Sequence, residues 1–269
     1  MIFIKRLFIT VFSVWLIVVP IVSLIEFIGS QGDVYWFAPM IGPLGILTYF
    51  AFVKWRKPFD SKTASLVITV MLGVCLLITV GQRFFDSEEI VTPIYLALGS
   101  LLGWLLYDRW FTSLPLINIV EEHFDPSGLK SASDENGSSE QAKFHVYIFH
   151  MGQSDPYSEA QARYYKKFEE DFKKTNAQIA FVSEEKSLTK ITKDSEVFTT
   201  LVDSDLKLAE KLKIVQDPVT PRGFLKWAKK VAIPTLLIEQ NGKVIFSRAD
   251  KDYRNRPDAE FILRILEAN

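Results

Sequence analysis

The sequence has almost no cysteine and little histidine. It contains one cysteine, Cys75, and three histidines among 269 residues. A single cysteine excludes an internal disulfide, a Cys-x-x-Cys redox pair and a zinc cluster built from cysteines. The chain also has little net charge, −1, with 31 Lys and Arg against 32 Asp and Glu. This balance argues against a nucleic-acid-binding protein, which needs a strongly basic face.

The charges that are present are distributed unevenly along the chain. Residues 1–110 hold 15 of the 63 charged side chains, and residues 111–269 hold the other 48. The sequence therefore predicts two domains, a membrane domain over 1–110 and a water-soluble domain over 111–269.

The first domain contains apolar stretches long enough to cross a bilayer. They cover residues 7–28, 35–53, 64–80 and 90–106. Each is close to the roughly 17–25 residues that a transmembrane helix needs, which predicts a bundle of four transmembrane helices. A cleaved signal peptide is the alternative for the first stretch, but its apolar run is too long and no small-residue cleavage site follows it.

The basic residues of the loops predict the orientation of these helices. One side of the predicted membrane carries Lys5, Arg6, Lys54, Arg56, Lys57, Lys62 and Arg109, and the other carries Arg83 alone. Loops rich in Lys and Arg stay on the cytoplasmic side. We therefore expect the N-terminus and the soluble domain to be cytoplasmic, in the inner membrane if the cell is bacterial.

Few side chains inside the predicted spans suggest chemistry. Glu26 is the one acidic residue within a span, and it lies where its carboxylate can reach the membrane surface. Gly99 and Gly103 have the GxxxG spacing that allows helix–helix association. Cys75 lies mid-span, where a thiol is unreactive. No ladder of charged residues indicates an ion path, and no paired histidines indicate a haem.

The second domain alternates strand and helix patterns. Strands are expected at 144–149, 178–182, 198–202, 234–238 and 244–247, and helices at 158–174, 188–192, 205–212 and 257–266. Asn241-Gly242 between the last two strands is a strong hairpin signal. The polar stretch 131–141 is expected to be a mobile loop. This order of elements, an α/β arrangement ending in a hairpin and a helix, is the thioredoxin layout.

Several segments of this domain resemble one family. They are Phe149–Gly152, Phe181–Glu185, Leu201–Ile214, Val231–Thr235 and the stretch from Asp250 to Asp258, which holds Asp252, Tyr253, Arg254 and Arg256. Together they resemble the peroxiredoxin-like branch of the thioredoxin superfamily, of the alkyl hydroperoxide reductase and thiol-specific antioxidant type. The resemblance implies a thioredoxin-like fold for 111–269, with a cis bond between Ile233 and Pro234 beside the active-site turn.

The chain departs from this family at the active site. The family carries a Trp-Cys-Pro-Tyr-Cys motif or a close variant, and the matching residues here include Asp155, Pro156, Tyr157 and Ser158. Both cysteine positions are thus replaced. Peroxide reduction needs a thiolate that can form a sulfenic acid, which neither a carboxylate nor a hydroxyl can do. Thiol peroxidase chemistry is therefore not expected at this site.

Asp155 has a structural and a catalytic interpretation. It directly precedes Pro156, and an Asp before a Pro at the first helical position is a strong N-cap. Its fixed negative charge would then stand in place of a thiolate. Alternatively, Asp155 is an acid or base in the former peroxide pocket, with Ser158 as nucleophile. A serine nucleophile needs a neighbouring base, and the sequence shows no triad.

Other candidates for binding chemistry are weaker. His145 and His150 lie five residues apart on or beside one strand and point to opposite faces, so we expect no shared metal. His123 follows two glutamates in a polar turn. A basic stretch contains Arg222, Lys226, Trp227, Lys229 and Lys230, and is either a solvated helix face or a contact for anionic lipid headgroups. No metal and no cofactor is expected.

These observations predict a membrane-anchored protein with a cysteine-less, peroxiredoxin-like domain. We expect this domain to bind a protein or an extended peptide in a groove between the start of the Asp155 helix and the Ile233–Pro234 loop, as a binding or regulatory module. One alternative is an oxidoreductase or hydrolase with altered chemistry. Another is a membrane transporter or sensor that the soluble domain regulates.

Overall fold

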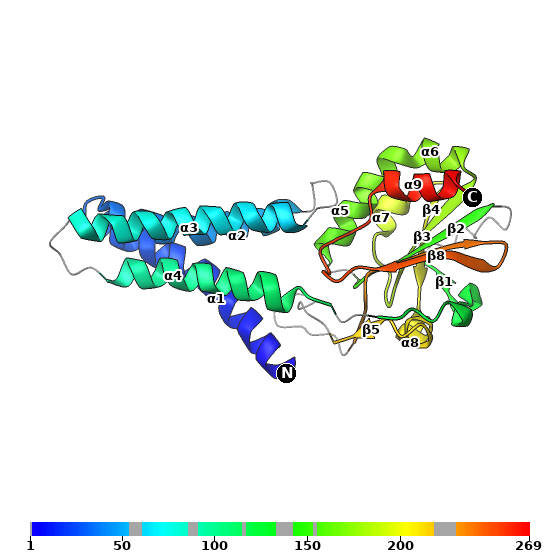
Figure 1. Ribbon diagram of the computed structural model, residues 1–269, viewed down its shortest axis with the longest axis horizontal. Helices are drawn as coiled ribbons and strands as arrows, with labels where there is room; N and C mark the ends of the chain where they lie inside the picture. Colours follow the sequence, from blue (N-terminus) through cyan, green and yellow to red (C-terminus); the bar gives the residue numbers. More distant parts are fainter. Residues whose placement is uncertain are drawn as a thin grey trace. The chain divides into compact units, whose positions relative to one another are not determined.

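A computed structural model describes residues 2–53, 61–85, 91–114, 117–132, 142–152, 155–217 and 230–269 (Figure 1). The chain divides into two units, with the boundary in this region between Thr112 and Ser113. The expected boundary lies two residues earlier, between Trp110 and Phe111.

The described residues of the first unit form four α-helices. They are α1 (Ile2–Gly29), α2 (Phe37–Phe52), α3 (Ser61–Phe85) and α4 (Thr92–Leu106). A short 3-10 turn, Val34–Trp36, precedes α2, and a π-helical turn, Tyr107–Phe111, follows α4. Many large apolar side chains on α1 and α3 are exposed, Leu7 and Leu77 among them. Such exposed apolar faces suit lipid contact.

Among the described residues, three helical stretches are long and apolar enough to cross a membrane. They are Phe3–Gly29, Val34–Phe52 and Thr63–Gln82. The fourth predicted span corresponds to α4, which has 15 residues and is shorter than a typical crossing helix. The structure thus supports three of the four predicted crossings, and the fourth remains a prediction.

The GxxxG face of α4 is covered by α1 of the same chain. A Cβ atom added at Gly99 would lie 2.6 Å from the Trp15 ring, and one at Gly103 would lie 2.4 Å from the Phe12 ring. Trp15 also donates its indole N–H to Ser100 Oγ at 3.0 Å. The two glycines therefore allow close packing inside this unit, so this face is already occupied by α1 and is not open for association with another chain.

The second unit is built on a six-stranded sheet in the order β1-β4-β3-β2-β7-β8. The bounds are β1 Lys130–Ser131, β2 Phe144–Phe149, β3 Ala177–Ser183, β4 Phe198–Val202, β7 Thr235–Gln240 and β8 Lys243–Ala249. Strands β2, β3 and β4 are parallel, whereas β1, β7 and β8 run antiparallel to their neighbours. A separate two-stranded ladder pairs β5 (Val215–Gln216) with β6 (Val231–Ala232).

The described helices of this unit are α5 (Pro156–Tyr165), α6 (Glu169–Lys174), α7 (Thr189–Thr192), α8 (Lys207–Lys211) and α9 (Ala259–Glu267). Helices α5, α6 and α9 form the main core with the sheet. Alternate residues of β2, such as Val146 and Ile148, pack with Tyr165, Phe172 and Ile262 in one apolar cluster. Helix α8 lies on the side of the sheet away from α6 and α9 (Figure 1).

Most predicted elements of this unit form close to their expected positions, with local differences. The helix expected over 158–174 is divided by a 3-10 turn at Lys166–Phe168. Asn241 and Gly242 both have positive φ, at 51° and 77°, as a type I′ hairpin turn requires. Within the stretch 131–141, Ser131 belongs to β1 and Ala132 donates its N–H to Thr200, so these two residues are not loop. Residues 133–141 lie outside the described residues.

Candidate functional site

Helix α5 begins with the N-cap that the sequence predicts. Asp155 has extended backbone angles, φ −93° and ψ 94°, and Pro156 follows it in the first turn. One carboxylate oxygen, Oδ1, accepts the backbone N–H groups of Tyr157 at 3.1 Å and Ser158 at 3.3 Å. The geometry expected of a capping Asp before Pro is therefore confirmed.

The second oxygen of Asp155 belongs to a buried ion pair. Arg256 Nη2 lies 2.7 Å from Asp155 Oδ2, and Ser158 Oγ donates to the same oxygen at 2.5 Å. The Asp155 side chain is 0% exposed and that of Arg256 is 2% exposed. Burial alone raises the pKa of Asp155, but the Arg256 charge and the Ser158 hydrogen bond outweigh it and hold this pKa below its usual value. Asp155 is thus ionised inside the fold.

Arg256 is itself fixed by the chain around it. Its Nη1 donates to the carbonyl oxygens of Tyr253 and Asn255. Arg254, two residues earlier, pairs with Asp252 through Nη2 and Oδ2 at 2.7 Å. The segment 252–256 therefore presents one arginine to Asp155 and holds the other within its own turn.

The same segment contacts α5 through aromatic rings. The Tyr157 and Tyr253 rings meet edge to face, with their centres 5.6 Å apart at an angle of 88°. The fold thus brings together residues 155–158 at the start of α5 and the segment 252–256, although about 100 positions separate them in the sequence. The contacts join these elements into one site.

His150 completes a second buried network beside this ion pair. The Gly152 N–H donates to His150 Nδ1 at 3.2 Å, so Nδ1 is an acceptor and the ring proton sits on Nε2. Nε2 then donates to Ser187 Oγ at 3.3 Å, Ser187 donates to Ser183 Oγ at 2.8 Å, and Ser183 donates to the Glu185 carbonyl.

His150 is neutral in this environment. Its ring is fully buried, and burial lowers its pKa to about 4, with the Arg256 charge acting in the same direction and the Asp155 charge against it. Because Nδ1 already accepts the Gly152 N–H, the ring has no free lone pair with which to take a proton from a serine. His150 and Ser187 are therefore a structural pair and not a base with its nucleophile.

Solved structures similar to this chain are peroxiredoxins. The chain is 20% identical to Mycobacterium tuberculosis AhpC, with 49% of this chain and 72% of that chain covered and a TM-score of 0.38. It is 16% identical to the bacterioferritin comigratory protein of Xanthomonas campestris, with 58% of this chain and 98% of that chain covered and a TM-score of 0.41. It is 21% identical to reduced Prx3 from Vibrio vulnificus, with 47% of this chain and 82% of that chain covered and a TM-score of 0.39. These matches cover between 47% and 58% of this chain.

No family model and no curated protein matches the chain. The one cysteine of the chain, Cys75, lies in α3 of the first unit, so the second unit contains no cysteine.

The expected cis bond before Pro234 is wrong. No cis peptide bond occurs among the described residues, which include Ile233 and Pro234. The Ile233 N–H donates to Ile214 at 2.7 Å, and Thr235 pairs with Phe149 in the sheet. The chain passes directly from the β6 ladder into β7, a course that fits the usual trans bond. Pro234 is buried and directly precedes Thr235, which pairs with Phe149 at the end of β2.

Other predicted candidates do not join this site. His123 Nδ1 lies 3.4 Å from the Lys211 carbonyl, and the His145 ring stacks near Tyr147. Within the described part of the chain, no three His, Cys, Asp or Glu side chains are grouped to hold a metal. Residues Arg222, Lys226, Trp227 and Lys229 lie outside the described residues, whereas Lys230 pairs with Glu210 at 2.7 Å.

Sequence reasoning missed the roles of Arg256 and Ser187. Arg256 was singled out as part of an end motif but not as the partner of Asp155. Ser187 was not singled out, because a lone serine after a strand has no distinctive spacing. Contacts between residues so far apart in sequence leave no periodic pattern in either segment.

Proposed function

We propose that this chain is a membrane-anchored protein whose peroxiredoxin-like unit binds and regulates a protein partner instead of reducing peroxide. The observation that carries the proposal is the Asp155–Arg256 ion pair. A permanent carboxylate occupies the position of the family's first cysteine, and both of its oxygens are already engaged.

The chemistry of this site supports a role without thiol turnover. A thiol peroxidase cycles through thiolate, sulfenic acid and disulfide, and a carboxylate enters none of these states. Ser158 is fully buried and donates a hydrogen bond to Asp155. Because the pKa of Asp155 is lowered, its carboxylate is a weak base. The altered oxidoreductase or hydrolase interpretation therefore has no activated nucleophile at Ser158.

The rigidity of the site supports a binding role. The Gly152 N–H is bonded to His150, and Asp155 is held by its cap of α5. Gly152 itself has φ +95°, and a Cβ there would meet Glu185 Oε1 at 3.2 Å. Residues that are already held in place lose less conformational entropy when a partner binds, which favours recognition of an extended protein segment at this end of the sheet.

Two measurements test this proposal with the full chain in nanodiscs. The first is hydrogen peroxide consumption with a dithiol reductant, for which we expect no turnover by the wild type or by Cys75→Ser. The second places a photo-crosslinking amino acid at Glu185, beside Gly152, or at Lys243 on β8 as a matched control. A discrete cross-linked protein is expected at Glu185 alone.

Either measurement can overturn the proposal. Peroxide turnover by the wild type that disappears in Cys75→Ser would show a working thiol. Equal cross-linking at Glu185 and Lys243, or none at either, would remove the argument for a binding face near Gly152.

A further inference from the structure

A second feature of the peroxiredoxin-like unit lies apart from the Asp155 site, at α7. A cavity of about 360 Å³ lies between α7, the first residues of β4 and Ala132 at the end of β1. Its volume falls at the lower end of the roughly 300–1,000 Å³ typical of small-molecule pockets. Neither the Asp155–Arg256 pair nor His150 lines it.

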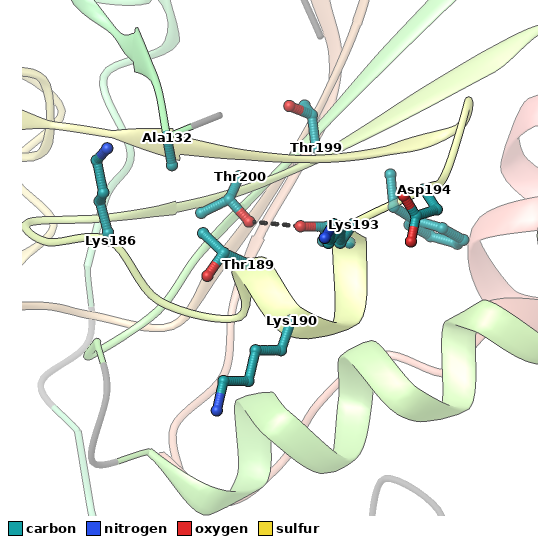
Figure 2. Close-up of a pocket in the computed structure, with 10 residues that line it drawn as sticks. Ala132, Lys186, Thr189, Lys190, Lys193, Asp194, Thr199 and Thr200 are labelled. Carbon is teal, nitrogen blue, oxygen red and sulfur yellow. Dashed lines mark hydrogen bonds between the residues drawn. The ribbon is translucent and has the colours of Figure 1, made fainter. Parts of the chain in front are cut away.

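The floor of this cavity is polar and uncharged. Thr200 on β4 points towards α7, and its hydroxyl lies 3.0 Å from that of Thr192 (Figure 2). Both side chains are buried. The rim differs in character, because Lys186, Lys190 and Lys193 line the cavity with one carboxylate, Asp194. The exposed Lys190 and Lys193 thus bring positive charge to the mouth of the cavity.

Lys190 and Lys193 line the same cavity from neighbouring positions. Lys190 lies in α7, and Lys193 directly follows the helix as its C-cap. The described residues place no carboxylate within ion-pair distance of either amine. By contrast, Lys173 lies 2.5 Å from Glu196, and Lys174 lies 2.9 Å from Asp171. An anion bound in the cavity would offset the repulsion between these two like charges.

Lysine is well suited to this arrangement. Lys190 and Lys193 are exposed, and in Figure 2 Lys190 extends from α7 away from Thr200. A lysine ammonium group is a point charge on a flexible four-carbon stem, so it can swing over a ligand at the mouth of the cavity. Phosphate groups are bound in this way by lysine point charges.

We infer that this cavity binds the phosphate group of a small phosphorylated compound, with Lys190 and Lys193 as the charged contacts and Thr200 on the floor. The inference is independent of the proposed function, because it involves none of the residues that replace the family's cysteines. A phosphate monoester on a lipid headgroup offers the same chemistry as a soluble phosphate compound.

The test is titration of the full chain with inorganic pyrophosphate by calorimetry, in phosphatidylcholine nanodiscs at constant ionic strength. We expect saturable binding to the wild type and at least about tenfold weaker binding to the double variant Lys190→Gln/Lys193→Gln. The control Lys243→Gln/Lys251→Gln removes the same charge from exposed positions elsewhere and is expected to bind within about twofold of the wild type.

A second arm separates the two sources of phosphate. Weaker apparent pyrophosphate binding in nanodiscs with phosphatidate, but not with phosphatidylserine, would assign the cavity to a lipid phosphate monoester. Unchanged binding in both would assign it to a soluble compound. Absence of saturable binding to the wild type, or equal binding to Lys190→Gln/Lys193→Gln, would overturn the inference.

Discussion

Arg256 Nη2 lies 2.7 Å from Asp155 Oδ2, an ion pair between residues 101 positions apart in the sequence. The pair is buried on both sides, and it joins the start of α5 to the segment before α9. Removing one member of such a pair leaves the other charged and without its partner, which costs more than losing a surface salt bridge.

We therefore predict a large local destabilisation for Asp155→Ala. A helix cap alone is worth on the order of 0.5–2 kcal/mol, whereas breaking a buried ion pair costs about 3–5 kcal/mol. Hydrogen–deuterium exchange of the α5 amides in the full chain measures this change. Asp125→Ala is the matched control, because Asp125 caps an exposed turn through Ser127. Equal effects of the two variants on their local amides would contradict the prediction.

We predict that acid weakens this site through His150. Its pKa is about 4 in the fold against 6.5 for a free histidine, so the folded state binds the proton less well than the unfolded state. The stability that this difference contributes is fully present above pH 6.5 and is lost as the pH falls towards 4, by up to about 3 kcal/mol. Asp155, whose pKa is also lowered, adds its loss only at lower pH.

The variant His150→Asn tests the source of this pH dependence. Asparagine retains an acceptor for the Gly152 N–H but does not titrate. Exchange protection of the β2 and α5 amides is expected to vary with pH in the wild type and in His145→Asn, and to become flat between pH 6.5 and 4 in His150→Asn. The same pH profile in wild type and His150→Asn would show that another group is responsible.

We predict that Gly103→Ala destabilises the helical unit by about 1–3 kcal/mol, because the added Cβ would lie 2.4 Å from the Phe12 ring. Gly73→Ala is the control, since its helical Cβ would meet no atom within 4 Å. Both changes raise helix propensity equally, so the difference between them reports packing. Thermal denaturation in detergent measures this difference in stability. Equal midpoints for the two variants would show that α1 does not pack closely against Gly103.

We predict that the N-terminus and the peroxiredoxin-like unit are cytoplasmic. The prediction depends on Lys5, Arg6 and the basic loop from Lys54 to Lys62 facing the same side. In bacterial cells, a cytoplasmic reporter fused after Arg109 is expected to be active, and one fused after Gly32 inactive. Activity of an export-dependent reporter after Arg109 would contradict the prediction, since it would mean either a reversed orientation or an odd number of crossings.

The sequence was a good guide where structure is local. Apolar runs located α1 to α4, and the short strand patterns located β2, β3, β4, β7 and β8. The Asp155-Pro156 pair predicted the start of α5, and Asn241-Gly242 predicted the hairpin. Each of these signals is contained within a few neighbouring residues, so tertiary contacts did not need to be known.

The sequence failed where two distant segments decide the outcome. The Asp155–Arg256 pair and the His150–Ser187 bond each join side chains from separate elements. The cis bond at Pro234 was expected from resemblance alone, and the strand pairing on either side of Pro234 is what fits the trans form. The cavity at α7 was not predicted, because its lining combines residues from separate elements, α7 and β4.

The short connection after α4 has a mechanical consequence. Only Thr112 follows the π-helical turn before Ser113 forms a β-bridge with Asp252, and the Leu114 N–H bonds to the Lys251 carbonyl at 2.6 Å. Asp252 holds Arg254, and Arg256 holds Asp155. A pull on the chain at Ser113 would therefore act first on the 251–256 segment, which is the segment that supplies Arg256 to Asp155.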